Sequence, residues 1–138
     1  MIDVGCGTGI LAIAIAKLFS SRIIAVDNDI HAVEMTRRNI VVNKVSQYVK
    51  VYKSTGLIGN HLNSGAKYDL VVANILYNPI KSMMRSIIEN LSDGGSLILS
   101  GLNVKQTKHL KEISKQFRLK VINEKKEANW GALLLKKI

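Results

Sequence analysis

Short apolar runs alternate along the chain with longer segments in which apolar residues recur every three or four positions. This alternation is typical of buried strands separated by amphipathic helices. The apolar runs predict strands over Met1–Val4, Arg22–Asp27, Tyr48–Lys53, Tyr68–Asn74 and Ser96–Gly101. The periodic segments predict helices over Gly9–Phe19, Asp29–Asn43, Pro79–Leu91 and Val104–Phe117.

Two of the predicted helices carry clear apolar stripes, and two polar segments interrupt the pattern. Glycine, asparagine and serine cluster in residues 54–67 and in Ser92–Gly95, which predicts a loop and a turn.

Asp29 is a suitable N-cap for the second helix. The stripe of the second helix is Val33, Thr36, Arg37, Ile40 and Val41, and that of the last is Val104, Leu110, Ile113 and Phe117.

The final 21 residues differ from the rest, because no helical segment separates their two apolar runs. We predict two strands joined by the polar connection Lys125–Asn129. A connection this short cannot form a parallel crossover, so the last two strands should be antiparallel. The whole pattern predicts a three-layer α/β fold whose mostly parallel sheet ends in an antiparallel edge.

The length of 138 residues predicts one domain over 1–138, and an apolar fraction of 47% is enough for a full core. Cys6 is the only cysteine, so no internal disulfide is expected. The first residues lack the basic region and cleavage site of a secretory signal. Lys17 interrupts the longest apolar run, Ile10–Phe19, which is too short to span a bilayer. We therefore expect a cytoplasmic protein without membrane contact.

The net charge of +10 is unevenly distributed. Residues 81–138 carry twelve Lys and Arg against five Asp and Glu, whereas residues 1–80 carry eight against five. A basic surface favours encounters with nucleic acid, so weak RNA or ribosome contact through the C-terminal half is one prediction. A lysine-rich surface that serves solubility alone is the other interpretation.

The glycine-rich segment DVGCGTG follows the first strand and precedes the first helix. One interpretation is the dinucleotide pattern G-x-G-x-x-G/A over Gly7–Ala12, with Asp27 at the distance expected for a ribose contact. The other is an acidic residue followed by three alternating glycines, Asp3, Gly5, Gly7 and Gly9. In both, glycine allows close approach of a ligand, and the helix N-terminus favours a negative group.

The ligand distinguishes these interpretations. A pyrophosphate needs only backbone donors, whereas an α-amino acid also benefits from a nearby carboxylate such as Asp3. S-adenosylmethionine has an α-amino group, a carboxylate and a ribose, and dinucleotide folds do not normally end in an antiparallel edge. We therefore predict S-adenosylmethionine as the cofactor, with Asp27 accepting the ribose hydroxyls; NAD(P) and a structural turn without ligand remain alternatives.

The opening motif resembles that of the seven-stranded class I S-adenosylmethionine-dependent methyltransferases. DLVVANIL, LILSGL and NWGALLLKK resemble the catalytic domain of the ribosomal protein methyltransferases that modify the eleventh large-subunit protein, and the resemblance covers essentially the whole chain. It implies a Rossmann-like fold and an enzyme that transfers methyl groups to amino groups of that protein. It also implies that Trp130 packs against the final strand.

The expected cofactor-binding residues are Asp3, Gly5, Cys6, Gly7, Gly9, Asp27, Asn28, Ser54 and Asn74. Asn74 is also the expected catalytic residue, because it ends a buried strand at the edge where α/β sheets place ligands. Amino-methyltransferases often have N/D-P-P-Y at this point to orient the substrate nitrogen. Here the segment reads Asn74-Ile75-Leu76-Tyr77, which agrees with the ribosomal protein family and disfavours adenine- and glutamine-modifying enzymes.

Two other functions remain possible from the sequence: an RNA methyltransferase, and a non-catalytic remnant of the fold. The resemblance implies helices before the first strand and an N-terminal recruiting domain, so we expect a chain truncated at its N-terminus. His31, His61 and His109 share no metal-ligand spacing, and no metal site is expected.

Overall fold

The computed structural model describes residues 1–57, 65 and 67–138. These form two compact units, Met1–Gly65 and Ala66–Ile138, which are described separately. The predicted loop over 54–67 lies partly outside the described residues, and His61 lies wholly outside them.

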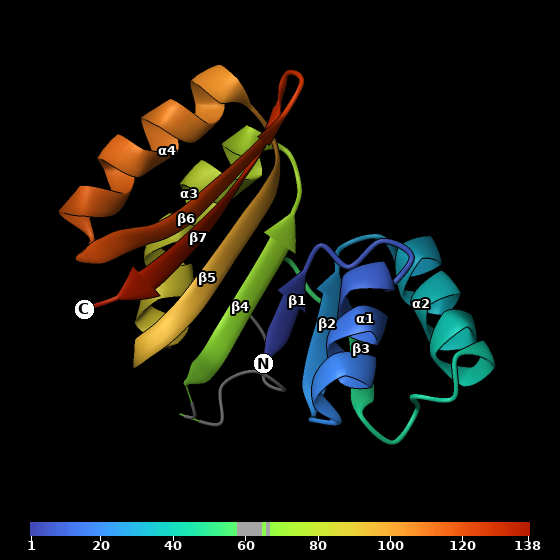
Figure 1. The fold of residues 1–138 in the computed structure, drawn as a ribbon. Helices are drawn as coiled ribbons and strands as arrows, with labels where there is room; N and C mark the ends of the chain where they lie inside the picture. Colours follow the sequence, from blue (N-terminus) through green and yellow to red (C-terminus); the bar gives the residue numbers. More distant parts are fainter. Residues whose placement is uncertain (58–64, 66) are drawn as a thin grey trace. The chain divides into compact units, whose positions relative to one another are not determined.

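In the first unit, three parallel strands lie in the order β3-β2-β1 beside two helices (Figure 1). Because the three strands are parallel, their carboxyl ends lie at the same edge of the sheet. Val4 pairs with Val26, and Asp27 pairs with Lys53. The elements are β1 (Ile2–Val4), α1 (Ile10–Phe19), β2 (Ile23–Asp27), α2 (Ile30–Val42) and β3 (Val49–Lys53).

The helices of this unit begin as their sequences predict. Gly9 precedes α1 with a positive φ of 82°, and Asp29 caps α2 by accepting a hydrogen bond from the backbone of His31. Only part of the predicted stripe of α2 is buried, because Arg37 and Val41 are exposed. The buried residues of α2 are Val33, Thr36 and Ile40.

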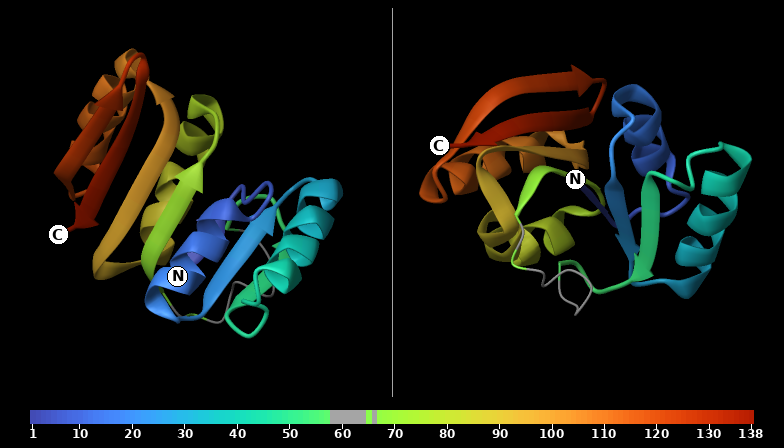
Figure 2. Two further views of the ribbon diagram at one scale, coloured as in Figure 1. Left: turned by 45° about the vertical axis from the view of Figure 1, so that its right-hand side comes forward. Right: turned by 90° about the horizontal axis from the view of Figure 1, so that it is seen from below.

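The second unit contains four strands in the order β4-β5-β7-β6, and α3 and α4 cover one face of them (Figure 2). β4 and β5 are parallel, whereas β7 is antiparallel to both β5 and β6, as the sequence predicts for the last pair. The elements are β4 (Tyr68–Asn74), α3 (Tyr77–Asn90), β5 (Leu91–Asn103), α4 (Val104–Gln116), β6 (Leu119–Glu127) and β7 (Trp130–Lys137).

Alternate residues of β5 and β7 form the core of this unit. Leu97, Leu99, Leu133 and Leu135 are at most 1% exposed, whereas Ile98 between them is 37% exposed. From the helices, the fully buried apolar side chains are Ile80, Met84, Ile87 and Leu110.

Four details of this unit differ from prediction. The predicted turn over Ser92–Gly95 lies inside β5, where Leu91 pairs with Tyr68 and Ser96 already pairs with Leu70. The extra residues therefore bulge out of the strand pairing and do not end the strand. The predicted connection Lys125–Asn129 is shorter than expected, because β6 continues to Glu127 and Ala128 turns with a φ of 50°.

The other two differences concern side chains that we expected to be packed. Val104, the first residue of the predicted stripe of α4, is 36% exposed, because the buried face of this helix is formed by Thr107, Leu110 and Ser114. Trp130 is 63% exposed, because it precedes the buried Gly131 on β7 and therefore lies on the face opposite Gly131, Leu133 and Leu135. Among the described residues, no helix combines the length and apolar character needed to cross a membrane.

Candidate functional site

The glycine loop between β1 and α1 is a tight backbone structure. Gly5, Gly7 and Gly9 have φ values of 73°, 56° and 82°, a region that other residues avoid. The backbone N–H of Gly5 donates to the carbonyl of Val26 at 2.8 Å, which attaches the loop to the end of β2. A Cβ added at Gly7 would meet no atom within 4 Å, so the loop is open at this position.

Asp27, at the end of β2, binds two backbone groups with one carboxylate. Its Oδ2 accepts a hydrogen bond from Gly7 N at 2.9 Å, and its Oδ1 accepts one from Asp29 N at 3.0 Å. The side chain is half-buried. Each carboxylate oxygen accepts more than one hydrogen bond, so Asp27 keeps acceptor capacity for a ligand while it supports the loop.

Ser54 and Asn28 lie beside Asp27, as the sequence predicts. The backbone N–H of Ser54 donates to the Asp27 carbonyl at 2.9 Å, and its hydroxyl donates to the Gly56 carbonyl at 3.2 Å. Asn28 is exposed between Asp27 and the N-cap of α2. The first unit therefore brings the predicted ribose and adenine residues together at the carboxyl ends of β2 and β3.

Asp3 is part of the core of the first unit, with 1% exposure. Its Oδ2 accepts a hydrogen bond from Ala12 N at 3.1 Å, which joins β1 to the first turn of α1. Burial raises the pKa of Asp3 to about 6; the Ala12 N–H lowers the pKa and the charge of Asp27 raises it further. The structure shows Asp3 supporting α1, and its direct contact with a ligand remains a prediction.

Cys6 lies in the loop with its thiol buried. Burial raises the pKa of Cys6 to about 11, despite a 3.5 Å contact between its Sγ and Thr36 Oγ1. The thiol therefore stays protonated near neutral pH and cannot act as a nucleophile there. Cys6 fills space beneath the loop, and its backbone N–H donates to the Val26 carbonyl at 3.0 Å.

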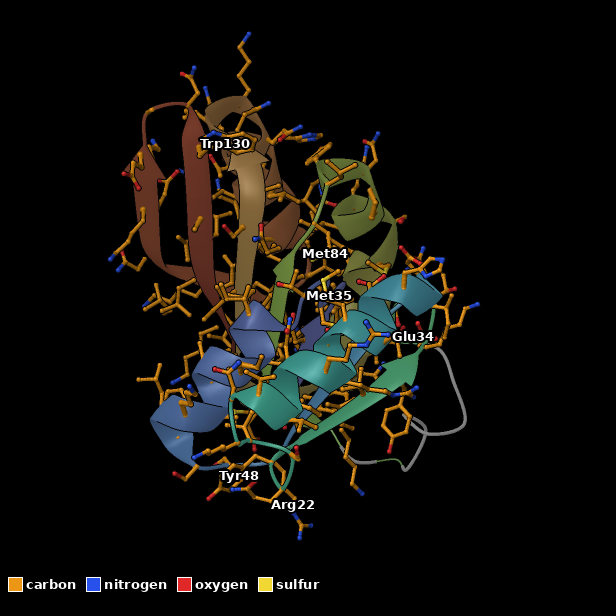
Figure 3. The ribbon with its side chains drawn as sticks, turned by 90° about the vertical axis from the view of Figure 1, so that its right-hand side faces the viewer. Arg22, Glu34, Met35, Tyr48, Met84 and Trp130 are labelled. Atoms are coloured by element: carbon orange, nitrogen blue, oxygen red, sulfur yellow. The ribbon has the colours of Figure 1, made fainter. Side chains whose placement is uncertain are left out.

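Two polar side chains of α2, those of Thr36 and Asn39, donate hydrogen bonds to the backbone of the glycine loop. Neither residue was predicted from the sequence to belong to the site. Thr36 is fully buried, and its hydroxyl donates to the Gly7 carbonyl at 3.0 Å. Asn39 Nδ2 donates to the Thr8 carbonyl at 2.8 Å. Both residues lie on α2, the helix on which Glu34 and Met35 are labelled in Figure 3. Only the polar character of Thr36 within an apolar stripe could have indicated its role.

In the second unit, Asn74 is exposed at the end of β4 and lies against Gly101 of β5. A Cβ added at Gly101 would be 2.7 Å from Asn74 Oδ1 and 3.1 Å from the Ile75 carbonyl oxygen. Gly101 also has a φ of 75°. The segments VANIL and LSG, which were noted separately in the sequence, therefore meet at this contact. No group of three or more His, Cys, Asp or Glu side chains suited to a metal forms within the described ranges.

Comparison with known proteins identifies the family. The family model for ribosomal protein L11 methyltransferase (PrmA) matches residues 1–138. The chain belongs to this family. A PrmA-family protein of Bradyrhizobium diazoefficiens, named ribosomal protein L11 methyltransferase, is 33% identical over 138 residues, which are 100% of this chain and 47% of the relative. A protein of the same name from Thiobacillus denitrificans is 45% identical over 106 residues, 77% of this chain and 33% of the relative.

The chain thus spans about half, or less, of the length of the curated PrmA relatives that it matches. A crystal structure of ribosomal protein L11 methylase from Lactobacillus delbrueckii subsp. bulgaricus has a TM-score of 0.89 and 25% identity, and it covers 99% of this chain and 69% of that chain. This likeness confirms the predicted fold class, a Rossmann-like α/β fold of seven strands that are mostly parallel. A methyltransferase from Pyrococcus furiosus, with a TM-score of 0.81 and 22% identity, shares the fold.

Proposed function

We propose that the first unit binds S-adenosylmethionine at the glycine loop, and that residues 1–138 act as one methyltransferase domain. The main support for this proposal is the position of the Asp27 carboxylate at the end of β2. One of its oxygens accepts a hydrogen bond from Gly7 N, and the side chain is partly exposed. A carboxylate in this position suits the two hydroxyls of a ribose. Membership of a methyltransferase family supports the same cofactor.

The residues around the loop fit the amino-acid end of this cofactor. Gly9, the N-cap of α1, makes no side-chain capping bond, and Asp3 binds the N–H of Ala12 in the first turn. A ligand carboxylate would therefore bind at the N–H groups that precede Ala12, at the positive end of the helix. The space beside Gly7 has no neighbouring atom within 4 Å. Asp3 adds negative charge behind the loop, which favours an ammonium group there even without direct contact.

The adenosine end would lie along Asp27, Asn28 and Ser54. Asp27 would accept the ribose hydroxyls, and Asn28 and Ser54 would contact the adenine. Gly5 and Cys6 would contribute by holding the loop to Val26 through their backbone N–H groups. When bound, S-adenosylmethionine supplies an electrophilic methyl group on a sulfonium.

Asn74 would orient the acceptor amine and contact the cofactor. Its side-chain oxygen accepts a hydrogen bond from a neutral amine and thereby directs the nitrogen lone pair. The absence of a side chain at Gly101 makes room for this amide, because a Cβ added there would be 2.7 Å from Asn74 Oδ1. Transfer of a methyl group from a sulfonium requires alignment more than acid–base catalysis, so one orienting amide is sufficient.

The proposed substrate is ribosomal protein L11, which the names of the relatives specify for those proteins. Incubation of the chain with labelled S-adenosylmethionine and purified L11 should label L11 and should not label ribosomal RNA. Label in the RNA alone would support an RNA methyltransferase. Absence of label from both would indicate a fold without catalytic activity.

We also propose weak RNA or ribosome contact through the basic surface of the second unit, in the cytoplasm where ribosomes assemble. Lys105, Lys108 and Lys115 are exposed on α4, and Lys120 and Lys125 are exposed on β6. RNA affinity that falls steeply with salt concentration would support this contact.

A further inference from the structure

The second unit contains a tyrosine–histidine pair to which the proposed function gives no role. Tyr77 is the first residue of α3, three positions after Asn74, and His109 lies in the middle of α4. The Tyr77 hydroxyl and His109 Nδ1 are hydrogen-bonded, and the two ring centroids are 5.8 Å apart with a tilt of 34°. Tyr77 is half-buried and His109 is exposed.

The hydrogen bond between Tyr77 and His109 connects the start of α3 to α4. Leu76, at the N-cap of α3, makes no side-chain capping bond and is 75% exposed. The segment from Asn74 to Tyr77 therefore has two lateral supports, which are the close contact with Gly101 at one end and the bond to His109 at the other. A tyrosine whose hydroxyl is hydrogen-bonded has few rotamers left, so the ring of Tyr77 is held in a defined orientation three residues after Asn74.

We infer that Tyr77 determines which acceptor amine is accepted, and that His109 is a positioning residue for Tyr77. The inference rests on the proposed function, in which Asn74 orients the acceptor. A tyrosine ring offers a flat surface that packs on the methylene groups next to an amine and excludes water from it. Its face also attracts a cation, which suits an amine that arrives protonated.

Four variants test this arrangement with the full 138-residue chain and purified L11 as acceptor. Tyr77→Ala should raise the acceptor KM by about tenfold or more, while Tyr77→Phe should raise it by about threefold, the size of one hydrogen bond. His109→Ala should also raise KM by about threefold, and His109→Gln, which keeps a hydrogen-bonding group, should restore part of the loss. The Kd for S-adenosylmethionine, measured by calorimetry, should stay within about twofold.

The double variant Tyr77→Phe/His109→Ala separates positioning from general stability. Because His109 acts through the tyrosine hydroxyl, His109→Ala should have no further effect on KM once that hydroxyl is absent. Gln116→Ala, an exposed residue of α4 outside the proposed site and the basic surface, is the matched control and should leave KM unchanged. Wild-type KM in Tyr77→Ala, or an equal loss for His109→Ala in both backgrounds, would overturn this inference alone. A wild-type chain that methylates no L11 would overturn the proposed function, and this inference with it.

Discussion

The carboxylate of Asp27 accepts a hydrogen bond from the backbone N–H of Gly7, with 2.9 Å between Oδ2 and N across 20 positions of sequence. Its other oxygen binds Asp29 N at the start of α2. One side chain at the end of β2 therefore sets the position of the glycine loop and of the next helix. Any ligand that binds Asp27 is placed relative to the loop by the same contact.

Replacement of Asp27 tests this double role. Asp27→Ala should raise the Kd for S-adenosylmethionine by about 100-fold, since charge-assisted hydrogen bonds to the ligand are lost. Turnover of the bound complex should change far less. Calorimetric titration measures the Kd, and single-turnover methylation measures the bound complex. Asp29→Ala, which removes only a helix cap worth about 1 kcal/mol, is the control and should leave the Kd nearly unchanged.

Two glycines of the loop should differ in their tolerance of alanine. A Cβ at Gly9 would be 2.7 Å from Thr36 Cγ2, whereas a Cβ at Gly7 has open space. Both have positive φ, so Gly7→Ala should cost about 1 kcal/mol and Gly9→Ala about 2–4 kcal/mol of unfolding free energy. Thr36→Ser removes Cγ2 and keeps the hydroxyl, so it should reduce the cost of Gly9→Ala. Urea unfolding measures each value; equal costs at the two glycines would contradict the packing described for Thr36.

Stability should depend on pH through Asp3. Its pKa is about 6 in the folded chain, against 3.8 as the ordinary value. Between these pH values the folded chain binds more protons than the unfolded chain, so the unfolding free energy falls as pH rises from about 4 to 6. The fall from this group is up to about 3 kcal/mol. Asp3→Asn keeps an acceptor for Ala12 N but does not titrate, so it should remove this part of the slope in urea unfolding from pH 4 to 7. An unchanged slope would contradict the burial of Asp3.

The contact between Gly101 and Asn74 should matter more for turnover than for donor binding. Gly101→Ala would push Asn74 Oδ1 and the Ile75 carbonyl away, since both lie within 3.1 Å of the added Cβ. We expect kcat to fall by at least about tenfold, and the Kd for S-adenosylmethionine to rise by a smaller factor because Asn74 is one of several proposed donor contacts. Gly94→Ala, at a similar φ of 74° with no atom within 4 Å, is the matched control on the same strand. Equal kcat values for the two variants would show that Asn74 needs no such restraint.

Most of the fold could be predicted because apolar periodicity is a local property. The strands over Tyr48–Lys53 and Tyr68–Asn74 and the antiparallel final pair follow from runs of buried side chains and short connections. The turn predicted over Ser92–Gly95 was wrong because Asp-Gly-Gly marks a break in regular pairing, and a bulge inside β5 is such a break. Sequence alone does not distinguish a bulge from a turn, because both use the same residues.

The candidate site was only partly predictable. The glycines, Asp27 and Ser54 could be recognised because they directly follow predicted strands. Thr36 and Asn39 could not, because their roles depend on contacts with loop residues 29 and 31 positions away. The capping box between Asn103 and Gln106 is a local sequence signal that marks the start of α4.

In the proposed complex, Asp27 binds the ribose of a sulfonium nucleoside held by the glycine loop. The most direct test is a crystal structure of the chain grown with S-adenosylhomocysteine, the demethylated product of the proposed cofactor. We predict ribose hydroxyls within hydrogen-bonding distance of the Asp27 carboxylate, and an amino-acid end against Gly7 and the N-terminus of α1. An empty loop, or a nicotinamide dinucleotide bound from a mixture of the two ligands, would contradict the account.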